Sequence, residues 1–228
     1  MKTIFTTPTP DLDKSTGFYE SLGFEIINSN GQTYAVSKQL IMEINPVRTA
    51  RAGIKIYGAD LDQMEKSLSE YTKVITTETG ILVADPSNVW MYFEKGDFPE
   101  IDLARSNVEL AGTYAGMSLE TTDIEKSIKI WSCLDITKTM GDASKGWVAY
   151  TSKTGLPVSF MAPNACPHLF FNPSLTYFNS GKNLEVVEKL RKADVPILEE
   201  ITAFNPEGKV DNVILRDPGG FGFFVFND

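Results

Sequence analysis

The stretch DLDKSTGFYESLGF, residues 11–24, decides the fold. It begins with Asp11, whose carboxylate can accept backbone N–H groups of a first helical turn and oppose the helix dipole. Apolar residues follow at helical spacing, at Leu12, Tyr19 and Leu22. The stretch therefore predicts a helix that starts at Asp11. Short strands are expected around it, one before and three after, at residues 2–7, 25–28, 34–37 and 40–45.

The chain repeats this pattern. Residues 10–15, PDLDKS, resemble residues 122–127, TDIEKS. Two further pairs of segments match in the same order, 81–88 (ILVADPSN) with 213–220 (VILRDPGG) and 61–66 (LDQMEK) with 184–189 (LEVVEK). Recurrences in a fixed order indicate internal duplication. The sequence therefore predicts a duplicated half, with two related units in each half.

Each unit has the same order of elements, one strand, one helix and three strands. Three of the helices are expected to begin at an aspartate, at Asp11, Asp60 and Asp123. The Asp85-Pro86 and Asp217-Pro218 pairs are typical of a tight turn before a last strand. The fold class predicted is α+β, with four βαβββ units in the 228 residues.

The helix covers only one face of such a unit, so the other face needs a partner unit. Two units side by side form a curved mixed sheet with an open concave face. The prediction is an N-terminal module at 1–95, a linker at 96–112 and a C-terminal module at 113–228. Because one chain supplies two complete modules, the protein can be a monomer or a homodimer.

Composition excludes several function classes. The chain has 21 Lys+Arg against 30 Asp+Glu, a formal net charge of −9, and no basic cluster, which argues against nucleic acid as a partner. No apolar run is long enough to cross a membrane, and the N-terminus lacks the features of a signal peptide, so a cytoplasmic protein is expected. The single histidine, His168, excludes any mechanism that needs two imidazoles from one chain.

The helix entry 11–24 and the two Asp-Pro turns resemble the vicinal oxygen chelate superfamily, which includes glyoxalase I, bleomycin-resistance proteins and extradiol dioxygenases. Residues 11–24 are close to that family's pattern D-x-x-x-S-x-x-FY-x-x-LGF. The resemblance covers essentially the whole chain and implies paired glyoxalase-like modules. Its members include isomerases, lyases, ring-cleaving dioxygenases and proteins that only bind drugs.

The resemblance also implies a divalent metal on the concave face, held by side chains from the first and last strand of each unit. Carried over unit by unit, those positions fall on Ile4 and Glu43, Gly53 and Tyr92, Gly116 and Ser159, and Leu175 or Thr176 with Phe224. Of these side chains only Glu43 is a suitable ligand. Glu94 lies two residues beyond Tyr92, and two carboxylates could hold only a hard, mostly hydrated ion. We therefore expect no metal or other cofactor, with a divalent ion as the alternative.

Alternation along 40–45 places Glu43 on the face opposite the helix, where Lys55 is a candidate cation to pair with it. Tyr57, Trp90 and Tyr92 occupy alternate strand positions in the same half and could line an aromatic pocket, with packing between units as the alternative. In the other half the expected lining is mostly apolar. The predicted site residues are Glu43 as the catalytic residue and Lys55, Tyr57, Trp90, Tyr92, Glu94, Glu120, Phe178 and Phe224 as ligand contacts.

Two functions are open. The first is a glyoxalase/bleomycin-resistance-like protein that binds a small organic molecule in an aromatic cleft without the family's metal. The alternative is a metal-dependent lyase, isomerase or dioxygenase of the same superfamily that uses Glu43, for example as a general base.

Overall fold

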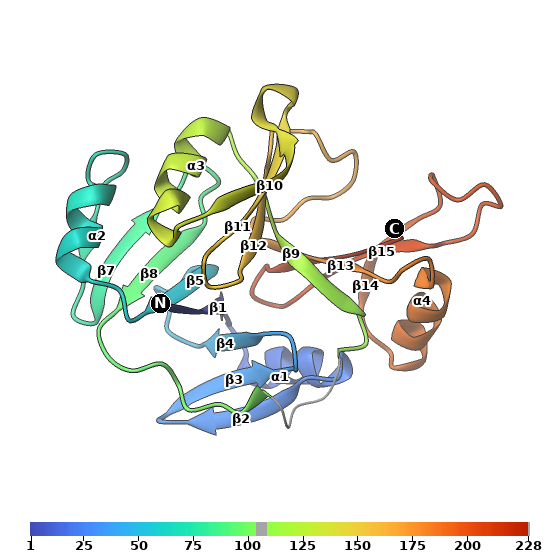
Figure 1. The fold of residues 1–228 in the computed structure, drawn as a ribbon. Helices are drawn as coiled ribbons and strands as arrows, with labels where there is room; N and C mark the ends of the chain where they lie inside the picture. Colours follow the sequence, from blue (N-terminus) through green and yellow to red (C-terminus); the bar gives the residue numbers. More distant parts are fainter. Residues whose placement is uncertain (104–108, 228) are drawn as a thin grey trace. The chain divides into compact units, whose positions relative to one another are not determined.

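The structure is a computed structural model that describes residues 1–103 and 109–227. It contains two eight-stranded mixed sheets, and the described residues form four α-helices (Figure 1). The first sheet has the strand order β2-β3-β4-β1-β5-β8-β7-β6, and the second has the order β10-β11-β12-β9-β13-β16-β15-β14. The predicted α+β class and the four βαβββ units are confirmed.

The strands of the first sheet are β1 (Lys2–Pro8), β2 (Glu25–Ser29), β3 (Gln32–Val36), β4 (Ile41–Asn45), β5 (Gly53–Tyr57), β6 (Ile75–Thr76), β7 (Gly80–Ala84) and β8 (Trp90–Glu94). Those of the second are β9 (Thr113–Glu120), β10 (Thr137–Asp142), β11 (Trp147–Thr151), β12 (Pro157–Met161), β13 (Ser174–Phe178), β14 (Ile197–Ile201), β15 (Asn212–Arg216) and β16 (Gly222–Phe226). The helices are α1 (Leu12–Ser21), α2 (Leu61–Leu68), α3 (Ile124–Trp131) and α4 (Asn183–Lys192), with short 3-10 turns η2 (Ser132–Leu134) and η3 (Ala143–Lys145).

The three predicted aspartate caps are present. Asp11, Asp60 and Asp123 each accept a hydrogen bond from the backbone N–H three residues later, at 3.1, 3.1 and 2.9 Å. Each bond satisfies a donor that the helix leaves unpaired. Helix α4 has no side-chain cap at its first residue. Local sequence therefore fixes where three of the four helices begin.

Contacts divide the chain into two compact units. Unit 1 comprises Met1–Thr6, Arg51–Pro99 and Gly116–Pro173, and unit 2 comprises Thr7–Ala50, Glu100–Ala115 and Ser174–Asp228. Unit 1 thus holds α2 with β5 to β8 and α3 with β10 to β12, whereas unit 2 holds α1 and α4. The module boundaries at 95 and 113 stay a prediction, because the compact units divide the chain differently from the two sheets.

A buried aspartate ties two repeats together inside unit 1. In the turn before β8, Asp85 accepts hydrogen bonds from the N–H groups of Ser87 and Val89, at 2.9 and 3.2 Å. It also accepts one at 3.0 Å from the indole Nε1 of Trp131, at the end of α3. Trp131 is fully buried and meets Phe160 edge to face, so its apolar body packs in the core while its polar tip satisfies the carboxylate.

Unit 2 repeats this arrangement with other residues. Asp217, in the turn before β16, accepts hydrogen bonds from the hydroxyls of Tyr19 on α1 at 2.9 Å and of Thr7 at 2.7 Å. The same turn approaches β1 so closely that a Cβ on Gly219 would lie 1.9 Å from the carbonyl oxygen of Pro8. Any larger residue at 219 would therefore displace the backbone. In each unit, the aspartate of a predicted Asp-Pro turn therefore accepts a hydrogen bond from a helix that belongs to another repeat.

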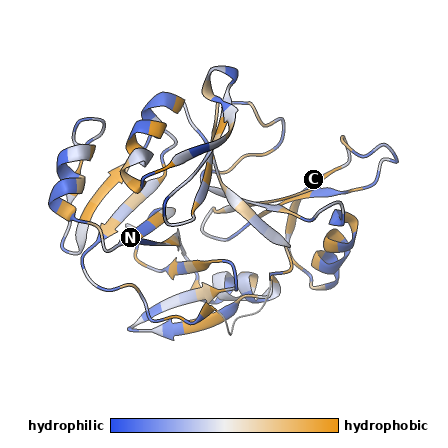
Figure 2. Ribbon diagram, viewed as in Figure 1, coloured by the Kyte–Doolittle hydropathy of each residue, from blue (hydrophilic) through white to orange (hydrophobic). Residues whose placement is uncertain are grey.

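Helices α2 and α3 each carry both hydrophilic and hydrophobic residues (Figure 2), and their buried residues include apolar ones. In α2 the buried residues are Met64 and Leu68, one helical turn apart. No helix in the described part of the chain is both long and apolar enough to cross a membrane.

Candidate functional site

In unit 1, five of the predicted site residues come together on one face of β5 and β8. The two strands are parallel, with Lys55 paired to Tyr92 and Tyr57 paired to Glu94. Because side chains alternate between the two faces of a strand, Trp90 shares this face with them. The five side chains are all half-buried, as expected for a face that is lined but still accessible.

Lys55 and Glu94 form an ion pair on this face. The distance from Lys55 Nζ to Glu94 Oε1 is 3.7 Å, and the two side chains are only 15% and 13% exposed. At this distance the contact is a charge pair rather than a short hydrogen bond. Low exposure reduces screening by water, so the pair fixes the position of the ammonium more strongly than a surface pair would.

Aromatic residues are the register partners of both members of the ion pair, Tyr92 of Lys55 and Tyr57 of Glu94. The rings of Trp90 and Tyr92 are stacked, with centroids 6.5 Å apart and planes 28° apart. The Tyr92 hydroxyl accepts a hydrogen bond at 3.1 Å from the backbone N–H of Arg51, which holds the phenol in place. At the other end of β5, Tyr57 meets the ring of Phe98 edge to face at 5.7 Å. Sequence reasoning missed Phe98, because it lies in the segment predicted as a linker.

Glu43, the predicted catalytic residue, lies in unit 2 on β4. It is 1% exposed, and its cross-strand partner on β3 is Tyr34. The Nδ2 atom of Asn45 lies 3.5 Å from Glu43 Oε2. Burial, followed by the charge of Glu43, raises the pKa of Tyr34. Tyr34 therefore stays protonated beside the carboxylate, a neighbour that the sequence did not reveal.

The other predicted contacts lie elsewhere. Glu120, at the end of β9, accepts a hydrogen bond from the N–H of Asn164 at 3.0 Å, and its own backbone bonds to the Asn172 side chain. Phe178 and Phe224 lie in unit 2; Phe178 is 39% exposed, and Phe224 is 2% exposed and stacks on Phe226. None of these three residues is on the β5/β8 face, so they do not add to its lining.

Strand register tests whether the metal site implied by the family resemblance fits unit 1. Ile4 on β1 pairs with Lys55, and Lys55 pairs with Tyr92, so the three residues form one row across the sheet. The β5 residue in this row is Lys55, two residues beyond Gly53, to which the resemblance carries the ligand position. An isoleucine, a lysine and a tyrosine do not make a site for a divalent cation, and the ammonium would repel one.

Side chains of the kinds that bind metals also form no such site elsewhere in the described residues. Among residues 1–103 and 109–227, no group of three or more His, Cys, Asp or Glu side chains is arranged to hold a metal ion. His168 lies in the loop between β12 and β13, away from the strand positions to which the resemblance assigns ligands. The side chains in this row of unit 1 therefore do not fit the metal that the family resemblance implies.

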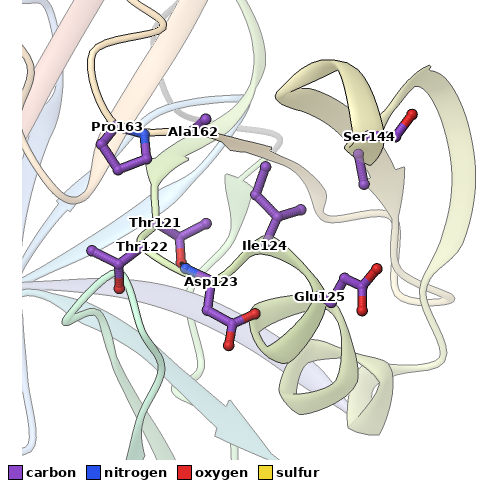
Figure 3. A pocket seen from close by; sticks show the side chains of 9 residues that line it. Thr121, Thr122, Asp123, Ile124, Glu125, Ser144, Ala162 and Pro163 are labelled. Carbon is purple, nitrogen blue, oxygen red and sulfur yellow. Dashed lines mark hydrogen bonds between the residues drawn. The ribbon is translucent and has the colours of Figure 1, made fainter.

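Unit 1 has hollows at the start of α3 and between α2 and α3, and neither is lined by a predicted site residue. One, of about 340 Å³, is at the start of α3 (Figure 3). Its polar groups already have structural roles, because Asp123 caps α3 and the hydroxyls of Thr121 and Ser127 lie 2.8 Å apart. The other, of about 520 Å³, lies between α2 and α3 and includes Cys133, whose pKa burial raises to about 12. That thiol is protonated at neutral pH.

Unit 2 contains a buried polar cluster that sequence reasoning did not find. Glu109, which is 3% exposed, accepts a hydrogen bond from the hydroxyl of Ser37. Burial raises the pKa of Glu109 to about 7, while the neighbouring Ser37, Tyr177 and Gln39 side chains pull it downward. Burial and then the charge of Glu109 raise the pKa of Tyr177 well above its usual value. The cluster lies in the core, so we assign it a role in packing rather than in chemistry.

Gln39 connects this cluster to the backbone. Its amide Nε2 donates to the carbonyl oxygen of Gly112 at 2.8 Å, and its Oε1 accepts from the N–H of Tyr114 at 2.8 Å. The N–H of Leu110 donates to the carbonyl oxygen of Leu22, also at 2.8 Å. Residues 109–114 are therefore tied firmly to unit 2, although the sequence predicted a linker over most of them.

Comparison with solved structures places the fold. A catechol 2,3-dioxygenase matches with a TM-score of 0.57 and 10% identity, over 97% of this chain and 85% of that one. An extradiol ring-cleaving dioxygenase from B. fuscum matches with a TM-score of 0.56 and 16% identity, over 97% and 70%. The chain has the vicinal oxygen chelate fold. The fold suspected from the helix entry and the Asp-Pro turns is thus confirmed.

A third vicinal oxygen chelate structure is a complex of homoprotocatechuate 2,3-dioxygenase from Brevibacterium fuscum with 3,4-dihydroxyphenylacetate. It matches with a TM-score of 0.55 and 15% identity, over 97% of this chain and 78% of that one. No family model and no curated protein matches the sequence. Identities of 10 to 16% establish a common fold, and activity has to be argued from the site.

Proposed function

We propose that this protein binds a small organic molecule on the β5/β8 face of unit 1, without the divalent metal that the family resemblance implies. The observation that carries the proposal is the row Ile4, Lys55 and Tyr92. None of the three side chains offers a carboxylate or an imidazole to a divalent ion, and the nearby carboxylate of Glu94 is already paired with Lys55. The ammonium of Lys55 therefore disfavours a metal in this row.

The chemistry of the face supports a ligand with an aromatic ring. Trp90 and Tyr92 present stacked rings, and Tyr57 adds a third ring on the neighbouring strand. Small-molecule sites are mostly apolar, with a few polar groups that set orientation, and here Lys55 and Glu94 would supply those groups. Glu120, in unit 1, and Phe178 and Phe224, in unit 2, remain proposed ligand contacts, each within its own unit.

A second candidate function is a metal-dependent lyase, isomerase or ring-cleaving dioxygenase that uses Glu43. Two observations favour it: the solved structures with this fold include dioxygenases, and Glu43 is a buried carboxylate next to Tyr34. A carboxylate within reach of a substrate proton can act as a general base.

Metal analysis separates the two functions. Protein purified without chelator, from cells supplied with iron and manganese, should contain far less than one divalent ion per chain. Its tryptophan fluorescence should be quenched saturably by members of a library of planar aromatic compounds. Stoichiometric metal that is lost in Glu43→Gln would instead establish the second candidate and refute the first.

Tryptophan variants locate the binding. The chain has three tryptophans, of which Trp90 is on the proposed face, Trp131 is fully buried and Trp147 is on β11. Trp90→Phe should remove most of the quenching and weaken binding, whereas the matched control Trp147→Phe should preserve both. Quenching that persists in Trp90→Phe and disappears in Trp147→Phe would move the site away from β5 and β8.

A further inference from the structure

A buried carboxyl group of unit 2, that of Glu109, has no cation among the described groups that shift its pKa. Glu109 is 3% exposed, and the hydroxyl of Ser37 donates a hydrogen bond to its Oε1. Its Oε2 is buried and has no hydrogen-bond partner among residues 1–103 and 109–227. The buried hydroxyl of Tyr177 has none there either, yet the two groups are close enough to shift each other's pKa. Buried polar atoms without partners are costly, so the position of the proton on this pair matters.

The neighbours of Glu109 favour its neutral form. They carry no positive charge and come from several elements: Tyr19 on α1, Ser37 and Gln39 between β3 and β4, Tyr114 on β9, and Tyr177 on β13. Burial raises the pKa of the three phenols, so they are uncharged at neutral pH. Behind Tyr19 is a second buried acid, Asp217, which accepts the Tyr19 hydroxyl at 2.9 Å. Among these acids and neutral groups a negative charge on Glu109 finds no counter-charge, whereas a protonated carboxyl needs none.

Glu109 begins the segment along which the chain leaves unit 2, after Ala115. The N–H groups of Leu110 and Tyr114 each donate at 2.8 Å to an acceptor in unit 2, one to a backbone carbonyl oxygen and the other to a side-chain amide oxygen. Carbonyl and amide acceptors do not change charge with pH. The carboxyl of Glu109 does, so it makes the attachment of residues 109–114 depend on pH.

We propose that Glu109 is a pH-sensitive switch that controls how tightly residues 109–114 are held in unit 2. With its proton, the carboxyl accepts from Ser37, donates from Oε2 to the hydroxyl of Tyr177 and needs no counter-charge. Without it, the carboxylate has those two hydroxyls as donors, and two neutral donors do not offset the loss of hydration. The segment therefore opens to water more often as the pH rises. Since Glu109 lies in unit 2, the switch is independent of the ligand proposed for the β5/β8 face of unit 1.

Hydrogen exchange measured by NMR tests the switch, because the N–H groups of Leu110 and Tyr114 exchange when the segment opens. Opening lets Glu109 ionise with its ordinary pKa of 4.5 instead of about 7, so each protection factor should fall by about 70-fold between pH 5 and pH 8. At pH 8 both should be at least about ten-fold lower than the protection factor of Ile214, a fully buried residue of β15 that reports unfolding of unit 2.

Variants assign the fall in protection to one carboxyl group. Glu109→Gln keeps the size of the side chain and removes its titration, so both protection factors should change little between pH 5 and pH 8. Glu20→Gln, which replaces an exposed glutamate on α1 of the same unit, is the matched control and should keep the fall. Tyr177→Phe removes a hydroxyl that lowers the pKa of Glu109, so the fall should become larger. This variant keeps the carboxyl and tests the switch even if glutamine at position 109 loosens the segment.

Four results would overturn the inference. Protection factors of Leu110 and Tyr114 that stay constant with pH in the unmodified protein would show that Glu109 does not control the segment. An equal fall in Glu109→Gln would assign the effect to another group. A smaller fall in Tyr177→Phe would contradict the role of the hydroxyl. Protection equal to that of Ile214 at pH 8 would mean that the segment opens only when the whole unit unfolds.

Discussion

Replacing Glu109 by glutamine should make the protein more stable at neutral and alkaline pH. Glu109 is buried in unit 2 against Ser37, Gln39 and Tyr177. In the part of the chain that the structure describes, no basic side chain is among the groups that shift its pKa. The carboxylate form is therefore unfavourable in the folded protein, and a neutral amide of the same size removes this disadvantage.

The expected magnitude follows from the pKa of Glu109, which burial raises from 4.5 to about 7. A group whose folded-state pKa is raised contributes stability that is fully present below pH 4.5 and is lost as the pH rises to about 7. Each pH unit in this window corresponds to roughly 1.4 kcal/mol, so the whole window corresponds to about 3 kcal/mol. The gain from Glu109→Gln should be near zero at pH 4 and reach about 3 kcal/mol at pH 8.

Urea denaturation at constant ionic strength, from pH 4 to pH 8, measures this difference. Far-UV circular dichroism and the fluorescence of the buried Trp131 report unfolding. The control is Glu125→Gln on α3, an exposed glutamate, whose effect should change little with pH. The quantity to compare is the stability of each variant minus that of the unmodified protein, because other groups titrate equally in both.

A difference that stays flat within about 0.5 kcal/mol would refute the reasoning. It would mean that Glu109 ionises in the folded protein as easily as it does in the unfolded chain, and therefore that solvent reaches it. A stability gain from Glu109→Gln that grows as the pH falls would contradict the upward direction of the Glu109 pKa shift.

Three further substitutions test the contacts within the units. Trp131→Phe removes the indole donor to Asp85 and should lower the free energy of unfolding by about 2 to 3 kcal/mol in guanidinium denaturation followed by circular dichroism. Tyr19→Phe removes the hydroxyl donor to Asp217 and should cost about 1.5 to 3 kcal/mol in the same assay; an effect below about 0.5 kcal/mol would show that water replaces the hydroxyl. Asp60→Ala removes the cap of α2 and should cost about 1 kcal/mol, measurable as a lower urea midpoint with an unchanged slope.

Local sequence predicted most of the secondary structure. The strands expected at residues 2–7, 25–28 and 40–45 are present, with bounds that differ by one residue, as Lys2–Pro8, Glu25–Ser29 and Ile41–Asn45, and the aspartate caps are at the predicted residues. These features depend on a few neighbouring residues, such as a carboxylate that can reach the N–H three residues later. For the same reason the Asp-Pro turns were visible in the sequence.

Contacts between distant residues were not visible in the sequence. Nothing local indicates that Trp131 reaches Asp85, or that Glu109 packs against Ser37. The sequence did hold one clue. Tyr19 and Trp131 occupy matching helix positions, and each has an apolar ring with one polar atom. When such a ring is buried, that atom needs a hydrogen-bond partner. The row that contains Lys55 could not be predicted because a shift of register by two residues preserves the face and changes the neighbours.

Comparison of the repeats separates structural from functional residues. The contact between Tyr19 and Asp217 matches the one between Trp131 and Asp85, so the residues that make the fold are kept in both units. The register of β13 with β16 also equals that of β5 with β8. The paired side chains differ, however. In β13 and β16 the pair is Thr176 with Phe224, and in β5 and β8 the corresponding pair is Lys55 with Tyr92.

The two pairs of strands share one backbone register but differ in charge, and this difference bears on the role of Lys55 and Glu94. A half-buried lysine and glutamate, such as Lys55 and Glu94, contribute little to folding, because loss of hydration largely offsets their attraction. The corresponding residues on β13 and β16 carry no charge, because Thr176 occupies the place of Lys55 and Phe226 occupies that of Glu94. The fold therefore forms without such a pair. The charges on β5 and β8 are therefore not needed for stability, as expected if they serve the binding function proposed above.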